Sequence, residues 1–180
     1  APIGSVLDSL SAPLRRAALK DEFMELARES SGGIKTLDET RQARLEEIVT
    51  TLLPALNPTA QPARSPLFSG EWECRWTTEA ELNFAVDKGL FGLPWERTYQ
   101  TIDVQSQLLT NFILFSDGAL TVGSSVVPDK DSADGARFNF AFSECLLRYK
   151  GVTVPLPPVG RGWGELLYLD DELRIQRDVR

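Results

Sequence analysis

The sequence predicts an α+β fold, mainly β, in which an N-terminal helical hairpin precedes an antiparallel β-barrel. Apolar residues in the first part of the chain recur at spacings of three and four, and a segment with three prolines follows. After Gly70 the apolar residues recur at every second position. We therefore expect a helical segment at 1–56, a linker at 57–66 and a barrel domain of roughly seven or eight strands at 67–180.

Two helices are expected in the N-terminal segment. The first covers residues 11–29, with Pro13 in its first turn. Thr36 and Glu39 have the spacing of a capping box, which opens a second helix that ends near Pro54. Each helix has one apolar face, which is typical of helices that pack as a hairpin.

Period-two patterns predict the strands. In the stretch 69–78, Trp72, Cys74 and Trp76 alternate with charged residues, so a strand places these three side chains on one face. We expect this face to point into the barrel, with Trp72 at its closed end and Trp76 nearer the middle. Further strands are expected at 107–115, 120–127, 137–143 and 173–177.

Three phenylalanines repeat the pattern of the tryptophan strand. Phe138, Phe140 and Phe142 share one face of the strand at 137–143. A barrel of about eight strands is just wide enough to be filled by side chains or to hold one small ligand. The rings therefore either line a cavity or fill it, and the sequence leaves both possibilities open.

The segment at 88–95 is apolar where an ordinary connection would be polar. It places Phe91 and Trp95 among glycines and a proline, after a short helix predicted from the capping box at 78–81. We expect it either to cap the open end of the barrel or to gate ligand entry and touch a lipid surface. The segment at 155–164, rich in proline and glycine, is expected to be a loop with a similar role.

Composition excludes several classes of function. The net charge of −7 and the pI near 4.7 argue against nucleic-acid binding, which needs a basic face. Because the chain has no histidine, Ser-His-Asp triads, Cys-His dyads and histidine zinc sites are excluded. Cys74 and Cys145 lack a CxxC spacing and are expected to be buried free thiols, unless the fold brings them together as a disulfide.

Two acidic segments are poor candidates for chemistry. The loop at 129–135 resembles a calcium loop, but Phe140 stands where the bidentate glutamate belongs, so we expect no metal. The acids at 170–172 are expected to form a solvated turn rather than an acid-base pair.

Five short blocks occur in the order typical of one family. They are Gly70-x-Trp72, Trp76-Thr77-Thr78, Gln100-Thr101-Ile102-Asp103 with Asn111, Pro155-Leu156-Pro157 and the run YLDDELRIQR at 168–177. Together they resemble the plastid lipid-associated protein (fibrillin) family. The early tryptophan with a late arginine is also similar to the wider lipocalin-like architecture.

The resemblance implies a lipocalin-like barrel in the plastid (chloroplast), at the stroma, thylakoid or plastoglobule. It implies binding of a hydrophobic metabolite, such as a carotenoid, quinone, tocopherol or fatty acyl lipid, without catalysis, cofactor or metal. The chain begins at Ala1 rather than Met, and we expect a leader to have been removed.

The resemblance also implies a structural seal. In the lipocalin-like architecture a late arginine packs over the tryptophan at the closed end. Arg174 and Arg177 are the candidates, and a face shared with Leu173 and Ile175 favours Arg177. A further apolar strand is implied after this block, so we expect either a trimmed C-terminus or an unclosed edge.

Three functions are compatible with these features. The leading one is a non-catalytic carrier of a hydrophobic metabolite. The second is a scaffold with a filled barrel that docks an isoprenoid- or lipid-metabolism enzyme at the membrane or plastoglobule. The third is an enzyme that uses Asp103 or Asp170 as a base on a bound lipid.

The carrier interpretation predicts a set of ligand-binding residues. Three of them, Gln100, Asp103 and Tyr168, are expected to form the polar end of the cavity. The full set is Trp72, Cys74, Trp76, Phe84, Phe91, Trp95, Gln100, Asp103, Phe138, Phe140, Phe142 and Tyr168.

Overall fold

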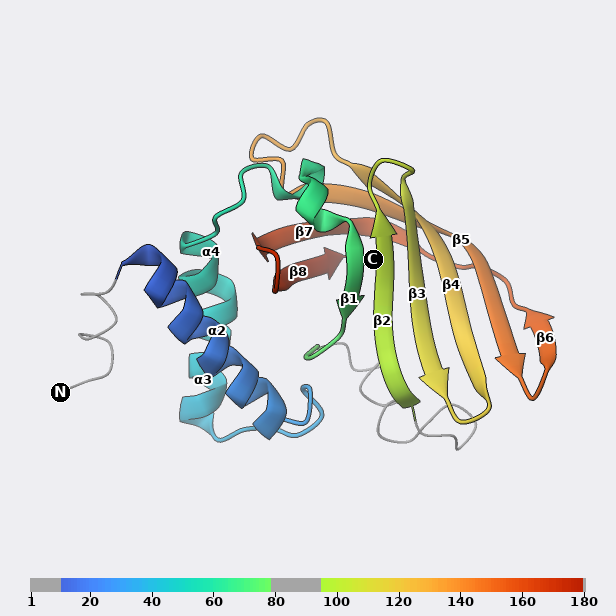
Figure 1. Ribbon diagram of the computed structural model, residues 1–180, viewed down its shortest axis with the longest axis horizontal. Helices are drawn as coiled ribbons and strands as arrows, with labels where there is room; N and C mark the ends of the chain where they lie inside the picture. The colour runs from blue at the N-terminus through green and yellow to red at the C-terminus, as the bar shows by residue number, and fades with distance from the viewer. Residues whose placement is uncertain (1–10, 79–94, 180) are drawn as a thin grey trace.

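The protein folds into a strongly curved antiparallel sheet with a pair of helices against one edge (Figure 1). The computed structural model describes residues 11–78 and 95–179. The predicted fold class is confirmed, since the fold is α+β, mainly β, with the helices first in the chain. The sheet forms a half-barrel, because its two edge strands are not paired with each other within these described ranges.

The helical segment contains two long helices connected by a turn. Ser11 and Pro13 start the first helix, as predicted. The second is capped by Asp38, whose carboxylate accepts a hydrogen bond from Arg41 N at 3.0 Å, and not by Thr36. None of the described helices is both long and apolar enough to cross a membrane. The elements are α2 (Ala12–Glu29), α3 (Glu39–Glu47), a π-helical turn η1 (Ile48–Leu52) and α4 (Leu53–Ala55).

Two 3₁₀ turns and eight strands follow in the described part of the chain. The turns are η2 (Pro62–Arg64) and η3 (Pro66–Phe68). The strands are β1 (Gly70–Glu73), β2 (Trp95–Asp103), β3 (Leu108–Phe115), β4 (Gly118–Pro128), β5 (Arg137–Tyr149), β6 (Val152–Pro155), β7 (Arg161–Leu169) and β8 (Arg174–Val179). Their order in the sheet is β1-β2-β3-β4-β5-β7-β8, with β6 paired to β5.

One strand prediction and one loop prediction need correction. The first strand ends at Glu73, because the chain beyond it bends toward the turn after α2, where Thr77 N donates to Gly32 O at 3.0 Å. The predicted loop at 155–164 contains the start of β7, which begins at Arg161. The predicted short helix after Thr78 and the apolar segment at 88–94 lie outside the described residues.

A bulge in β7 decides which face of this strand meets the helices. The pairing with β8 shifts between Leu166 and Tyr168. Leu166 therefore points to the inside of the curl, whereas Tyr168 points outward with its partner Ile175. Both outward side chains pack in one core with Phe23 of α2 and Leu45 of α3.

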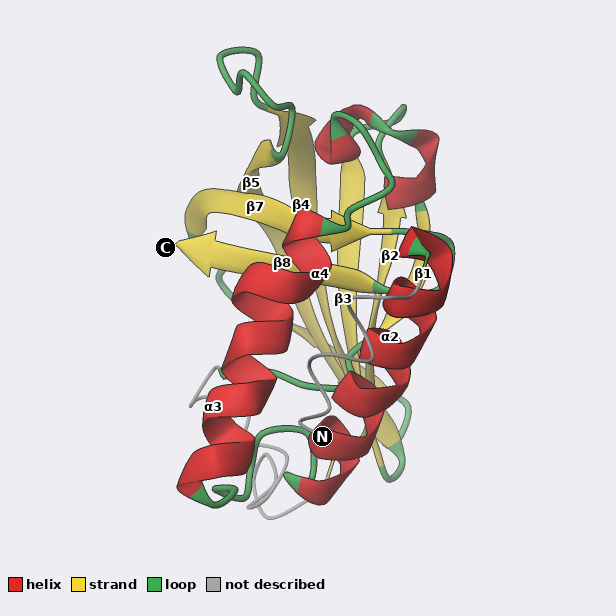
Figure 2. Ribbon diagram, turned by 90° about the vertical axis from the view of Figure 1, so that its left-hand side faces the viewer, coloured by secondary structure: helices red, strands yellow, loops and turns green. Residues whose placement is uncertain are grey.

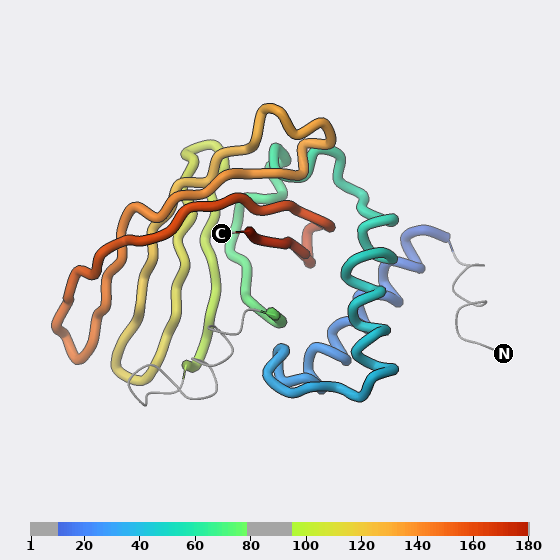
Figure 3. Tube along the Cα trace, turned by 180° about the vertical axis from the view of Figure 1, so that it is seen from behind, coloured from blue at the N-terminus to red at the C-terminus, as the bar shows by residue number. Residues whose placement is uncertain are grey.

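The helical pair thus covers the outer face of β7 and β8. Figure 2 shows α2 and α3 in front of β8, and Figure 3 shows the same C-terminal strand between the helices and β1 from behind. A second core lies inside the curl, around Phe68 and Phe138. We refer to the inner side of the curved sheet as the concave face.

Candidate ligand-binding site

The three phenylalanines of β5 lie on the concave face, as predicted. Phe138 is 1% exposed and Phe140 is 9% exposed, and Phe142 is partly buried. The Phe140 and Phe142 rings pack at 5.8 Å between centroids, and Phe138 packs on Phe68 at 5.1 Å. This end of the half-barrel is therefore filled by side chains.

Alternating glycines in β7 make room for these rings. Gly164 is the pairing partner of Phe138, and Gly162 is the partner of Phe140. A Cβ atom on Gly164 would collide with the Phe138 ring, and one on Gly162 would lie 2.9 Å from Phe140 Cζ. The alternation of glycine opposite phenylalanine is a packing signal that sequence reasoning missed, although both patterns are visible in the chain.

The aromatic end is closed by Trp72 and an arginine. The Arg174 guanidinium carbon lies 5.4 Å from the centroid of the Trp72 ring and 5.8 Å from that of Phe68. Trp72 Nε1 donates a hydrogen bond to Phe68 O at 3.1 Å. Arg174 thus has the position that the lipocalin-like architecture implies for the sealing arginine.

The preference for Arg177 as the seal is wrong. Its side chain is 62% exposed and pairs with Glu165 on the neighbouring strand. Arg177 does share a face with Leu173 and Ile175, but this is the outer face. Leu173 and Ile175 pack there under the helices. Arg174 alternates with Ile175 and shares the concave face with Gln176, the partner of the inward Leu166.

A row of polar side chains crosses the concave face beside the seal. Arg174 Nη2 donates to Gln100 Oε1 at 2.5 Å, and Gln100 Nε2 donates to Asn111 Oδ1 at 2.6 Å. Asn111 Nδ2 then donates to the carbonyl of Val122 at 3.5 Å. Because β8 and β2 are not neighbours in the sheet, the first bond crosses the interior and joins the two unpaired sides of the half-barrel.

The Arg174 guanidinium is strongly desolvated. Burial lowers its pKa from 12.5 to about 10, although Asp178 and Cys74 favour the charged form. Its Nη1 atom is buried and has no hydrogen-bond partner among the described residues. Oε1 of Gln176, on the concave side of β8, is also buried and has no hydrogen-bond partner among the described residues.

Beyond the polar row the concave face is apolar, and several of its side chains are only partly buried, although Ile113, the partner of Leu120, and Phe115 are 8% and 4% exposed. Leu120 and Leu147 pair across β4 and β5, and Val122 pairs with Cys145 beside them. All four are partly buried, unlike the phenylalanines at the other end. This half of the concave face has apolar surface that a ligand could cover.

Several predicted site residues lie elsewhere. Tyr168 is on the outer face under the helices, because of the β7 bulge. Asp103 is exposed at the end of β2, where its carboxylate accepts hydrogen bonds from Ser106 in the following turn. Neither side chain lies on the concave face, and of the three residues predicted for the polar end only Gln100 does.

Trp76, Cys74 and Trp95 come together outside the curl. Trp76 packs edge-on against Phe23 of α2 at 6.2 Å, because β1 has already ended. With Cys74 and Trp95 it lines a small cavity of about 180 Å³ between β1, β2 and the turn after α2. Cys74 is exposed, contrary to the expected buried thiol, and Cys145 is partly buried; the two cysteines are not joined in a disulfide.

The remaining predicted site residues lie outside the described part of the chain. These are Phe84 and Phe91.

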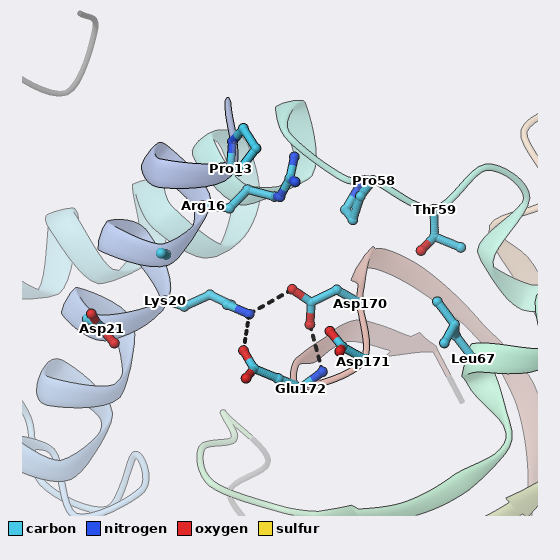
Figure 4. A pocket seen from close by; sticks show the side chains of 11 residues that line it. Pro13, Arg16, Lys20, Asp21, Pro58, Thr59, Leu67, Asp170, Asp171 and Glu172 are labelled. Atoms are coloured by element: carbon cyan, nitrogen blue, oxygen red, sulfur yellow. Dashed lines mark hydrogen bonds and ion pairs between the residues drawn. The ribbon is translucent and has the colours of Figure 1, made fainter. Parts of the chain in front are cut away.

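A larger surface pocket lies between α2 and the β7–β8 turn. It has a volume of about 650 Å³ and is lined by charged residues of both elements (Figure 4). Lys20 of α2 reaches across it and bonds Asp170 Oδ2 at 2.8 Å and Glu172 Oε2 at 2.5 Å. The turn predicted at 170–172 is present, but Asp170 is 8% exposed and not solvated as expected.

Asp170 connects α2 to the β7–β8 turn, and we refer to its carboxylate with these hydrogen bonds as the Asp170 clasp. Its carboxylate also accepts hydrogen bonds from Tyr168 Oη at 2.6 Å and from the N–H groups of Glu172 and Leu173. Burial alone would raise the pKa of Asp170, but the hydrogen bonds from Lys20, Tyr168 and the backbone outweigh it and lower the pKa. A carboxylate with a lowered pKa and occupied oxygens is a weak base.

Comparisons with known proteins agree on one family. The sequence model of the PAP_fibrillin family matches residues 17–180. A curated relative, "Probable plastid-lipid-associated protein 11, chloroplastic" from Arabidopsis thaliana, is 36% identical over 175 residues, which cover 93% of this chain and 77% of the relative. No solved structure matches the chain significantly.

These matches confirm the resemblance seen in the short sequence blocks. The match covers both the helical pair and the curved sheet. The relative is chloroplastic by name, and the plastid location implied by the resemblance is confirmed. The chain belongs to the plastid lipid-associated protein (fibrillin) family.

Proposed function

We propose that the protein is a non-catalytic carrier that binds a hydrophobic plastid metabolite on the concave face of its half-barrel. The candidate ligands are a carotenoid, a quinone, a tocopherol or a fatty acyl lipid, at thylakoids or plastoglobules. The observation that carries the proposal is the partly buried apolar surface around Leu120, Val122 and Leu147. The name of the Arabidopsis relative, a plastid-lipid-associated protein, supports the same class of ligand.

Burial of apolar groups supplies the driving force in this proposal. Each methylene removed from water contributes about 0.8 kcal/mol. The filled aromatic end around Phe138 gives the ligand no space, so the apolar chain lies along β3, β4 and β5 beyond the polar row. Gln100 and Asn111 then stand at the boundary between the filled end and the ligand.

A pair of neighbouring substitutions on β4 tests this location. Leu120 faces the concave side, whereas Thr121 pairs with Leu146 on the other side of the sheet. Leu120→Glu places a charge in the proposed binding surface and should weaken binding at least tenfold, since an unpaired carboxylate is costly in apolar surroundings. Thr121→Glu is the matched control and should bind as the wild type does.

The measurement is a tryptophan fluorescence titration with a carotenoid, a plastoquinone analogue and a fatty acid, with circular dichroism to check folding. Equal affinity of a folded Leu120→Glu variant and the wild type would place the ligand elsewhere. Organic extraction of protein purified from plastids identifies the class of any bound ligand.

The second candidate is a scaffold that docks an isoprenoid- or lipid-metabolism enzyme at the membrane or plastoglobule. It is favoured by an exposed apolar strip at the end of the sheet farthest from the helices (Figure 1). Val152 and Val154 of β6 are 62% and 44% exposed, and Val159 in the next loop is 81% exposed. The same titration separates the two functions, because a scaffold with a filled interior binds none of the three ligands.

A further inference from the structure

The interior of the half-barrel holds a cation that forms no direct ion pair with a described carboxylate, although Asp178 on the same strand favours its charged form. Arg174 contacts two aromatic rings and one neutral amide, and no described carboxylate lies within ion-pair distance of it. Its Nη1 atom is buried and donates no hydrogen bond within the described ranges. A buried charge without a partner costs several kcal/mol, so folded proteins seldom keep one unless it has a function.

The neighbouring polar groups of the row do not bond this atom. Gln100 already uses its oxygen for Arg174 Nη2 and its nitrogen for Asn111, and Asn111 continues the row to a backbone carbonyl. Every bond in the row runs in the same direction, from Arg174 outward. The row therefore fixes the guanidinium in place and leaves Nη1 unbonded, and an unbonded acceptor on the same face of β8, Gln176 Oε1, forms no bond with it.

We propose that Arg174 binds the carboxylate head of a long-chain acyl ligand, held by the free Nη1–H on the concave face. This inference rests on the proposed carrier function and specifies its ligand. A carboxylate supplies both an acceptor and the missing negative charge, and hydrogen bonds between ions are about twice as strong as neutral ones. Gln176 Oε1 needs a donor, so it takes no part in holding this head group.

The other ligand classes fit this site less well. A carotenoid hydrocarbon offers no acceptor, and the carbonyl of a quinone or an ester offers an acceptor without charge. The seal residues Trp72 and Phe68 close one side of the guanidinium. The acyl chain accordingly extends from the polar row toward Val122 and Leu120, over the partly buried half of the concave face.

The test compares ligands that share one tail and differ in the head. Palmitate, methyl palmitate and hexadecanol are titrated against the wild-type protein by tryptophan fluorescence and by calorimetry. We expect palmitate to bind at least about tenfold more tightly than the ester, because only the acid neutralises the guanidinium. This comparison needs no variant.

Substitutions then attribute the preference to Arg174. Arg174→Met should lower palmitate affinity at least about tenfold and leave that of methyl palmitate within roughly twofold, whereas Arg174→Lys, which keeps the charge, should retain the preference. Arg177→Met is the matched control on the same strand, since that side chain is exposed and paired with Glu165. It should bind all three probes as the wild type does.

The outcomes separate this inference from the carrier proposal. Equal wild-type affinity for palmitate and its methyl ester overturns the role of Arg174 and leaves the carrier proposal standing. A preference for palmitate that survives in a folded Arg174→Met protein also overturns it. No binding of any probe, including the carotenoid and the quinone analogue, contradicts the carrier proposal itself.

Discussion

At the scale of single residues, packing on the concave face depends on the absence of side chains in β7. Gly162 and Gly164 lie opposite Phe140 and Phe138, and the rings occupy the space that a Cβ atom would need. Protein interiors are close-packed, so even one added methyl group forces neighbouring atoms to move. Alternating glycines opposite alternating phenylalanines therefore specify this strand pair.

This complementarity gives a prediction for Gly164. Gly164→Ala should lower the free energy of unfolding by about 1 to 3 kcal/mol, because its methyl group collides with the Phe138 ring. Urea unfolding measures the change. Gly123→Ala is the control, since a Cβ there would lie 3.5 Å from Glu144 Cβ, an ordinary contact. Equal unfolding midpoints for the two variants would contradict the packing argument.

At the scale of elements, the β7–β8 turn is attached to α2 by one buried carboxylate. Asp170 accepts hydrogen bonds from Lys20 and Tyr168 and from two backbone N–H groups of its own turn. Burial and the adjacent carboxylate raise the pKa of the Tyr168 hydroxyl, so the hydroxyl stays protonated and remains a donor. The YLDDEL segment thus fixes the helical pair on the sheet.

The clasp predicts a pH dependence of stability. Folding lowers the pKa of Asp170 below its unfolded value of 3.8, so the unfolded chain takes up the proton more readily than the folded protein. The stability from Asp170 is therefore fully present above that unfolded pKa and is lost as the pH falls through the lower folded-state pKa. Asp170→Asn should cost about 2 kcal/mol at neutral pH and weaken the acid dependence.

Urea unfolding at neutral and acidic pH measures both effects. Asp171→Asn is the control, because Asp171 is the exposed neighbour in the same turn. If the Asp170→Asn and Asp171→Asn proteins unfold at the same urea concentration, the clasp does not stabilise the fold.

At the scale of the whole molecule, the helical pair and the half-barrel share one apolar core. Leu45 of α3 is fully buried in a cluster that includes Tyr168 and Ile175 of the sheet. The edge strand β8 is joined inside to β2, the neighbour of the other edge strand β1, by the bond from Arg174 to Gln100 and not by backbone pairing. The helices and the sheet therefore depend on each other for burial of apolar surface.

A shared core predicts cooperative unfolding. Leu45→Ala should cost about 2 to 5 kcal/mol, as expected for a cavity at a fully buried leucine. The loss should appear at one urea midpoint both by circular dichroism at 222 nm, which follows the helices, and by tryptophan fluorescence. Separate midpoints for the two signals would show that the helical pair unfolds independently of the sheet. Met24→Ala, at an exposed position of α2, is the control.

Local sequence patterns predicted much of the fold but only part of the candidate site. The change from helical to period-two spacing located the helices and four of the strands within a few residues. Phe138, Phe140 and Trp72 were correctly expected on the inside. Trp76 and Tyr168 were not, because the end of β1 and the bulge in β7 have no clear signal in the chain.

The sequence by itself determined the fold class, the family and the alternation of phenylalanine and glycine that packs β5 on β7. These features depend on residue types and spacings that a single chain displays. Only the tertiary structure decided that Arg174 and not Arg177 faces Trp72, and that Asp170 is buried under α2. The physical reason is that strand side chains alternate with a period of two, so which residues of β8 face inward depends on how this strand pairs with β7, which a single chain does not display.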